Sequence, residues 1–261
     1  MIPVPPHPKK KLGQNFLQDE NILRKIVEFI APVRADSIVE IGAGTGALTA
    51  RLAPLVTKLI AVELDPALIP YLAVIPDITV LQADIRKTNL CSLVPEVTVR
   101  VVGNLPYYLS THLLALLIRQ KGCIQDMTLM FQEEVANRIT ASSSTHEYGY
   151  LSVLTQYYCK INRGFKISRN SFFPRPDVES RILALSFRKD TAIPFPEFSS
   201  FIEIAFSQRR KKLRNNLLRL QNVSQDALDK AYRELELPAD IRAENLTASR
   251  FEQLILALRS A

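Results

Sequence analysis

Short apolar runs that alternate with helical patterns constrain the fold of this 261-residue chain more than any other feature. Five runs predict strands, over residues 38–41, 58–64, 78–81, 97–102 and 127–131. Helical spacing occupies most of the intervals between them, which is typical of a mostly parallel sheet covered by helices on both faces. Residues 160–167 and 182–187 are expected to form a late antiparallel pair. The sequence therefore predicts an α/β fold of the Rossmann-like type.

The character of the sequence changes near Arg188. After Pro194 and Pro196 only helical patterns remain, which predicts a small all-α domain over residues 191–261. The preceding 190 residues are expected to form the α/β domain. Within it, residues 1–17 are expected to be extended and mobile, followed by a helix that Asp19 caps and that runs to about Ile30.

Charge and cysteine content limit the class of protein. Lys and Arg exceed Asp and Glu by 33 to 26, so the net charge of +7 favours a polyanionic partner, although solubility alone is another interpretation. The three cysteines are widely spaced, and we expect reduced thiols rather than disulfides or metal ligands. The apolar runs are too short to cross a bilayer, and the start of the chain lacks a secretory pattern. A cytoplasmic protein without a membrane segment or a metal is expected.

Residues suited to a ligand follow the ends of the first three predicted strands. The loop Gly42–Gly46 follows the first, Glu63 ends the second and Asp84 follows the third. Ligands of open α/β sheets bind at the carboxyl ends of the strands, where an acid can accept ribose hydroxyls. Each feature alone also fits a tight turn, a helix cap or a solvated acid. Together, and without a Walker lysine, they indicate an adenosine ligand lacking pyrophosphate, such as S-adenosylmethionine.

The sequence Asn104–Tyr107 ends the fourth predicted strand. The lone pair of an adenine amine is delocalised into the ring, so the amine is a poor nucleophile. The side-chain oxygen of Asn104 and the backbone carbonyl of Leu105 can each accept one of its N–H bonds and so orient it. Tyr107 can stack on the base, as extruded bases require. This chemistry acts by positioning and electrostatics, without an obligatory general base. A plain strand-ending turn is the alternative interpretation.

Seven stretches together resemble the ribosomal RNA adenine dimethyltransferases, the KsgA family, along nearly the whole chain. They are residues 13–17, 39–49, 61–65, 83–84, 104–108, 172–180 and 205–216. The family transfers two methyl groups to N6 of each of two adjacent adenosines, in a hairpin loop near the 3′ end of small-subunit (16S) rRNA. The resemblance implies this rRNA dimethyltransferase activity, with S-adenosylmethionine as cofactor and an immature small ribosomal subunit as partner, and we expect a monomer.

The resemblance also implies roles for individual residues. Residues 1–190 would be the S-adenosylmethionine-binding methyltransferase domain, with residues 1–17 as a mobile N-terminal lid that folds over the cofactor. Residues 191–261 would be a small helical RNA-binding domain. The residues implied to contact the cofactor are Asn15, Leu17, Gly42, Gly44, Glu63, Asp84 and Asn104. Asn104 and Leu105 would hold the target amine, and Tyr107 and Phe172 would enclose the target base. The chain departs from the family's common pattern at Ala43 and at residues 172–176. Of the two adjacent phenylalanines, Phe172 is expected to stack by alignment.

A basic stretch near the end of the chain is the candidate RNA contact. Residues 205–220 contain six basic residues and no acid, and apolar residues between them predict a helix that docks with its charge outward. Arg209, Arg210, Lys211, Lys212 and Arg214 are the expected RNA-binding residues. A solvated helix face is the alternative interpretation.

Three other functions remain as rivals. One is an adenine methyltransferase of large-subunit rRNA, another is a catalytically silent RNA-binding factor, and the third is an NAD-dependent enzyme. The glycine spacing opposes the last, because a dinucleotide site has GxGxxG where this chain has GxGxG. None of the three histidines has the spacing of a metal site.

Overall fold

The computed structural model describes residues 7–94, 98–221 and 223–260. The strands are β1 (Phe16–Leu17), β2 (Ser37–Ile41), β3 (Lys58–Glu63), β4 (Thr79–Gln82), β5 (Val99–Asn104), β6 (Ile124–Gln132), β7 (Cys159–Ile167), β8 (Phe172–Phe173) and β9 (Ser180–Phe187). The α-helices are α1 (Glu20–Ile30), α2 (Thr49–Leu52), α3 (Ile69–Leu72), α4 (Leu90–Leu93), α5 (Ser110–Arg119), α6 (Glu133–Thr140), α7 (Tyr150–Tyr158), α8 (Phe195–Ala205), α9 (Leu213–Leu217), α10 (Gln225–Glu234) and α11 (Ala248–Arg259).

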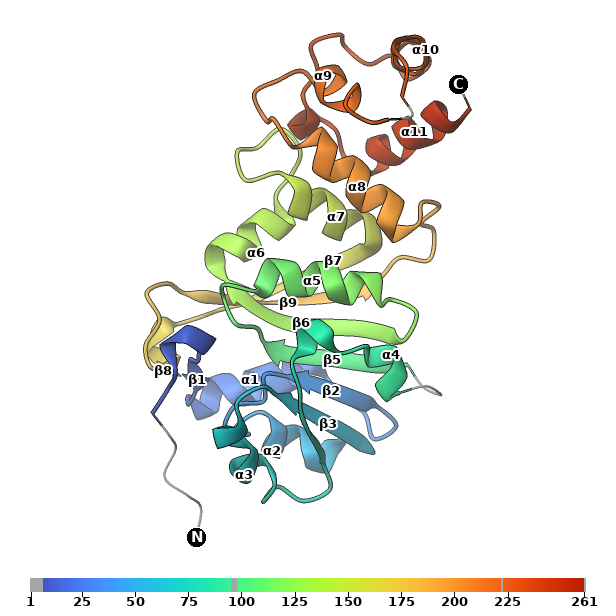
Figure 1. Cartoon of the computed structure of the whole chain (residues 1–261). Coiled ribbons are helices and arrows are strands. Elements are labelled where there is room, and N and C mark those ends of the chain that lie inside the picture. Colours follow the sequence, from blue (N-terminus) through green and yellow to red (C-terminus); the bar gives the residue numbers. More distant parts are fainter. Residues whose placement is uncertain (1–6, 95–97, 222, 261) are drawn as a thin grey trace. The chain divides into compact units, whose positions relative to one another are not determined.

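Seven strands form one twisted sheet in the order β4-β3-β2-β5-β6-β9-β7 (Figure 1). The first five of these strands pair in parallel, and β9 pairs antiparallel with β6. This order confirms the predicted Rossmann-like α/β fold with its late strands β7 and β9 as neighbours. Strand β5 begins at Val99 in the described part, and the predicted start at Val97 lies outside the described residues.

Helix α1 shows why the local sequence folds as predicted. The carboxylate of Asp19 accepts hydrogen bonds from the backbone N–H groups of Asn21 and Ile22, so it caps the helix. The buried side chains Leu23, Ile26 and Ile30 recur at helical spacing and belong to the same core cluster as Ile38 of β2 and Ile182 of β9. Burial of this stripe therefore fixes the helix on the sheet.

Two compact units divide the chain. The first comprises Met1–Ala136 and Ile161–Phe187, and the second comprises Asn137–Lys160 and Arg188–Ala261. The predicted boundary at residues 190/191 assigns residues 137–160 to the α/β domain, whereas the structure groups them with the C-terminal helices in the second unit. Within the second unit, Tyr157 of α7 stacks on Phe198 of α8 with ring centroids 3.9 Å apart, and the Tyr158 hydroxyl donates to the carbonyl of Ile193 at 2.9 Å. These contacts place α7 with the C-terminal helices.

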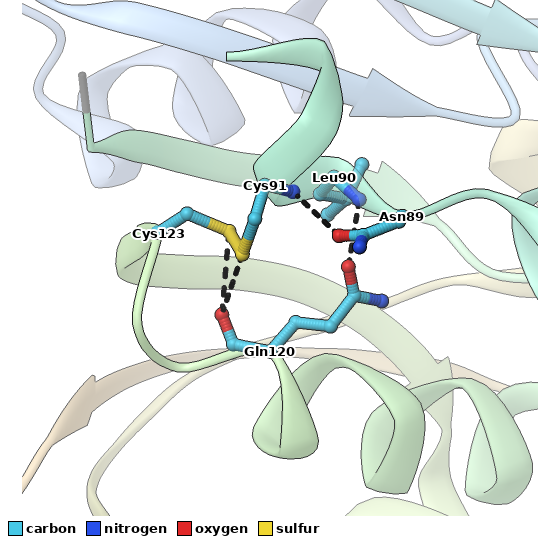
Figure 2. The surroundings of a disulfide bond; sticks show 5 residues. All are labelled: Asn89, Leu90, Cys91, Gln120 and Cys123. Atoms are coloured by element: carbon cyan, nitrogen blue, oxygen red, sulfur yellow. Dashed lines mark hydrogen bonds between the residues drawn. A yellow bond between two sulfur atoms is a disulfide. The ribbon is translucent and has the colours of Figure 1, made fainter. Parts of the chain in front are cut away.

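The expectation of reduced thiols is wrong for two of the three cysteines. Cys91 and Cys123 form a disulfide, and Figure 2 shows it beside Asn89 and Gln120. Cys91 lies in α4 and Cys123 directly precedes β6, so the fold brings their Cα atoms to 5.2 Å although 32 residues separate them in the sequence. The Gln120 side-chain oxygen accepts from the backbone N–H of Leu90 at 2.6 Å and fixes the same turn. Cys159 is buried outside this bridge.

No helix in the described ranges is long and apolar enough to cross a membrane. The same ranges contain no group of three or more His, Cys, Asp or Glu side chains that could hold a metal ion.

Candidate functional site

The candidate site lies at the carboxyl ends of β2, β3 and β5, in the first unit. One cavity is lined by Asn15, Gly42, Gly44, Glu63, Asp84 and Asn104, among others. Parallel neighbouring strands end at one edge of the sheet, which is why residues distant in the sequence meet there. The structure thus brings together six of the seven residues predicted to contact the cofactor. The seventh, Leu17, is buried on β1 and lines an adjoining hollow with Asn15 and Gly42.

The glycine loop approaches the cavity with its backbone. Gly42 and Gly44 have φ angles of +70° and +62°, a region that side chains with a Cβ rarely adopt. A Cβ atom added at Gly44 would also lie 3.2 Å from the ring of Phe16. The positive φ angle therefore favours glycine at position 44, and a larger residue would also have to displace the ring of Phe16.

Glu63 is 7% exposed and is held by the backbone around it. Its Oε2 accepts from the N–H of Gly44 at 2.8 Å, and its Oε1 accepts from those of Leu64 and Asp65 at 2.8 and 2.9 Å. Each carboxylate oxygen has two lone pairs, so Oε2 retains one acceptor position. This arrangement suits one ribose hydroxyl directly, and a second would have to replace a backbone donor.

Asp84 is paired with a side chain that the sequence did not single out. The guanidinium of Arg86 donates to both carboxylate oxygens, with Nε–Oδ1 and Nη2–Oδ2 distances of 2.9 and 2.6 Å. These hydrogen bonds hold the pKa of Asp84 below its ordinary value. The carboxylate is thus ionised and fixed in orientation at the cavity wall.

Asn104 has one satisfied amide atom and one unsatisfied one. Its Nδ2 donates to the backbone carbonyl of Asn15 at 3.1 Å. Its Oδ1 is buried and has no hydrogen-bond partner among the described residues. A carbonyl oxygen can only accept, so the amide nitrogen must face Asn15 and the amide oxygen must face away. An unsatisfied buried acceptor is costly, and at a cavity wall it indicates a ligand donor.

Glu40, which was not singled out from the sequence, lines the same hollow as Asn104. It is 3% exposed and lines the adjoining hollow together with Gly42 and Asn104. Its Oε2 has no partner in the described part of the chain. Burial raises the pKa of Glu40 to about 8, and the charge of Glu63 adds to the effect. The sequence signal for Glu40 was its place two residues before the glycine loop.

Tyr107 is anchored by a residue of a distant strand. Its hydroxyl and the hydroxyl of Ser180 on β9 lie 2.7 Å apart in a hydrogen bond. Burial raises the pKa of Tyr107, and the bond to Ser180 opposes that rise. The hydroxyl is therefore neutral, and the side chain is held in place in the lining of the cavity that also contains Asn104.

Phe172 does not line the cavity. It is 4% exposed and lies in the core cluster that contains Leu17 and Met130, whereas Phe173 is 56% exposed. The two rings differ because successive side chains of a β-strand point to opposite faces, and Phe172 and Phe173 are the two residues of β8. The pairing matches Leu17 with Phe172 and Phe16 with Phe173. The stacking role of Phe172 remains a prediction that this geometry does not support.

The basic stretch belongs to the second unit and is not one helix, contrary to the prediction. Helix α8 ends at Ala205, residues 206–212 form turns, and α9 begins at Leu213. The Asn216 amide donates to the carbonyls of Ala205 and Gln208 at 2.7 and 3.2 Å and so stabilises the interruption.

The basic side chains differ in what they contact. Arg209 bonds to the carbonyls of His146 and Tyr148, and Arg214 forms an ion pair with Asp229 at 2.6 Å. In the described chain no acid lies within ion-pair distance of the exposed Arg210, Lys211 and Lys212.

Comparisons with known proteins show what the chain is similar to. The sequence model described as ribosomal RNA adenine dimethylase matches residues 7–259. A ribosomal RNA small subunit methyltransferase A from a Marinomonas species is 43% identical over 80% of this chain and 81% of that protein. The protein of the same name from Coxiella burnetii is 40% identical over 94% of this chain and 96% of that one.

Two solved structures share the fold. A dimethyladenosine transferase from Plasmodium falciparum matches with a TM-score of 0.82 and 26% identity, over 94% of this chain and 98% of that one. The 23S rRNA methyltransferase ErmE matches with a TM-score of 0.68 and 24% identity, over 94% of this chain and 100% of that one. The methyltransferase fold with a helical C-terminal part is therefore confirmed.

Proposed function

Since the chain belongs to the ribosomal RNA adenine dimethylase family, we propose that it dimethylates N6 of two adjacent adenosines in a hairpin loop near the 3′ end of small-subunit rRNA. The small-subunit methyltransferases of Marinomonas and Coxiella support this substrate, because they are 43% and 40% identical to the chain over 80% and 94% of its length. The substrate is rRNA within an immature small subunit.

The observation that carries the proposal is the unsatisfied Oδ1 of Asn104 beside the glycine loop. This oxygen accepts one N–H of the adenine amine, and the carbonyl of Leu105 accepts the other. Two acceptors on one amine orient its lone pair and favour a pyramidal nitrogen, so the chain catalyses by positioning. Tyr107, held by Ser180, supports the plane of the base.

The residues present fit S-adenosylmethionine. When bound, this cofactor supplies an electrophilic methyl group on a sulfonium. The glycine loop allows close approach at Gly42 and Gly44, the remaining lone pair of Glu63 accepts from the ribose, and Asp84 accepts from the adenine amino group. None of these contacts needs a pyrophosphate, in agreement with the absence of a Walker lysine.

Three finer statements complete the proposal. Arg210, Lys211 and Lys212 contact RNA phosphates directly, while Arg209 and Arg214 first shape the loop and then add charge. The enzyme acts as a monomer. It acts in the cytoplasm, where ribosomal subunits assemble; the cysteines no longer support this location, because two of them form a disulfide.

Methyl transfer by the Asn104→Ala variant tests the proposal. Labelled S-adenosylmethionine is offered with undermethylated small-subunit particles, protein-free small-subunit rRNA or large-subunit rRNA. We expect the wild type to methylate the particles and Asn104→Ala to lose about 10²-fold or more in kcat, the size of effect that one transition-state hydrogen bond has elsewhere. Cofactor affinity by calorimetry should change little.

Asn170→Ala is the matched control, because Asn170 is exposed and does not line the cavity. Full dimethylation by Asn104→Ala would contradict the role of its amide oxygen. Labelling of large-subunit rRNA alone would favour the rival substrate, and no labelling of any RNA by the wild type would favour a silent binding factor.

A further inference from the structure

The segment from Lys9 to Leu17 is fastened at both ends. At its C-terminal end, Phe16 and Leu17 form the β1–β8 ladder, and the N–H of Gln18 donates to the carbonyl of Ser171 at 2.9 Å. At its N-terminal end, Lys9 and Gln14 bond to one carboxylate on a different element. Between these two attachments the segment forms one wall of the cofactor cavity.

Asp65 is the receptor at the N-terminal end. It follows β3 two residues after Glu63 and is 1% exposed. Its Oδ1 accepts from Lys9 Nζ at 2.6 Å and from the N–H of Ala67 at 3.1 Å. Its Oδ2 accepts from Gln14 Nε2 at 2.8 Å.

The charge of Asp65 is stabilised by these donors. Burial alone would raise the pKa of Asp65, but the hydrogen bonds from Lys9 and Gln14 hold it below the ordinary value. Gln14 also accepts from the backbone N–H of Lys9 at 2.7 Å, so the three residues form one closed cluster. A hydrogen bond to an ionised acceptor such as Asp65 is stronger than one between neutral groups.

Asn15 connects this cluster to the chemistry. It directly follows Gln14, and its carbonyl is the acceptor that fixes the Nδ2 of Asn104 at 3.1 Å. If the segment withdrew, the amide of Asn104 would lose the contact that distinguishes its nitrogen from its oxygen. Either atom could then face the target amine, and only the oxygen can accept from it.

We propose that Lys9, Gln14 and Asp65 form a latch that closes residues 9–17 over the cofactor cavity and, through the Asn15 carbonyl, orients Asn104 for the target amine. The three are positioning residues: Lys9 and Asp65 do not line the cavity, and Gln14, which does, uses its amide nitrogen to bond to Asp65. The inference rests on the proposed function, because it takes Asn104 as the acceptor for the amine. Closure of residues 9–17 over the cofactor cavity and orientation of the Asn104 amide for the target amine thereby occur together.

Two single variants of the full-length protein test the latch, with undermethylated small-subunit particles as substrate. Lys9→Met removes the charged donor, and Asp65→Asn removes the charge while keeping an oxygen for Ala67. We expect each to lower kcat/KM about tenfold, both by a higher KM for S-adenosylmethionine and by a lower kcat. The double variant should be little worse than either single one, because both remove the same contact.

Two controls separate positioning from folding. Lys11→Met removes a nearby exposed lysine and should leave kcat and KM unchanged. Lys9→Arg should restore most of the loss, because it restores the charged donor. A purely structural role would lower the melting temperature and the yield of active protein without moving KM. If Asp65→Asn does not fold, Lys9→Met alone tests the latch. The side chain of Lys9 is 41% exposed, so its substitution is expected to leave the protein folded.

Wild-type kcat and KM in both Lys9→Met and folded Asp65→Asn would overturn the latch. If Asn104→Ala is inactive in the same assay, the proposed function stands and only the latch fails. If the wild type itself transfers no methyl group to the particles, it is the proposed function that fails.

Discussion

The two ends of strand β5 contrast sharply in how their polar groups are satisfied. At the amino end, Arg100 is 14% exposed and donates to Asp36, Asp126 and the carbonyls of Ile30 and Ala31. At the carboxyl end, four residues later, Asn104 has a buried oxygen without a partner in the described chain. The same strand is thus fully bonded at one end and left with an acceptor at the other.

The difference shows where stability and function lie in this unit. The amino edge of the sheet also carries the disulfide beside the starts of β5 and β6. The carboxyl edge carries left-handed glycines and the buried acid Glu40. Unsatisfied groups and unusual backbone angles lower stability and are expected where a ligand completes the structure. Substitutions at the two edges should therefore affect different measurements.

Arg100→Met should give the largest loss of stability. Removing the cation leaves Asp36 and Asp126 in a partly buried site without their partner, which typically costs about 3–5 kcal/mol. Chemical unfolding should show this decrease, while methyl transfer per folded molecule stays near that of the wild type. Arg119→Met, on an exposed part of α5, is the control. If Arg100→Met lost all activity and kept its stability, the amino edge of the sheet would not be the edge that serves stability.

Removal of the disulfide is the next largest effect. By the chain-entropy relation, a 32-residue separation corresponds to about 3–4 kcal/mol. The Cys91→Ala/Cys123→Ala variant should unfold at a lower temperature and lose the sensitivity of the wild type to reductant. A Cys159→Ala variant should keep that sensitivity. Equal melting temperatures with and without reductant in the wild type would show that the bridge contributes nothing.

Phe172 and Phe173 allow a stability effect and an RNA-binding effect to be compared at two adjacent positions, one buried and one exposed. Phe172→Ala empties part of the core and should lower the free energy of unfolding by about 3 kcal/mol. Phe173→Ala removes an exposed ring and should change stability little. If the stacking role belongs to Phe173, that variant will raise the KM for RNA at unchanged stability. Reduced turnover in Phe172→Ala at full stability would instead support the alignment-based prediction.

The sequence predicted the sheet and most of the cavity for a local reason. Strands β2, β3 and β5 are short β-rich runs: Gly42 follows the first, and Glu63 and Asn104 end the other two. Their parallel order brings those ends together. Strand β1 and its partner β8 have only two residues each, too few for any periodic signal. The bonds of Lys9 and Gln14 to Asp65 join residues more than 50 positions apart, and a single sequence holds no trace of such a contact.

The incorrect predictions have physical causes of the same kind. The helix expected over residues 205–220 fails because the side chain of Asn216 satisfies carbonyls at the end of α8, which apolar spacing does not reveal. The reduced state expected for Cys91 and Cys123 fails because three-dimensional proximity, not sequence spacing, decides pairing. Sequence patterns report local preferences, whereas these contacts arise only in the folded chain.

Glu40→Gln is the variant whose effect on stability depends on pH, with a sign that follows from the raised pKa of Glu40. The pKa of Glu40 is raised from 4.5 to about 8 in the folded chain, so the folded state retains a proton that the unfolded state has lost between these values. Stability from this group is therefore full below pH 4.5 and falls by up to about 1.4 kcal/mol per pH unit until pH 8. Glutamine cannot ionise and removes this slope. The stability of Glu40→Gln relative to the wild type should thus increase from pH 5 to pH 8, measured by chemical unfolding. A constant difference across that range would show that Glu40 is ionised in the folded protein, and the carboxyl edge would then contain a charge balanced as fully as Arg100.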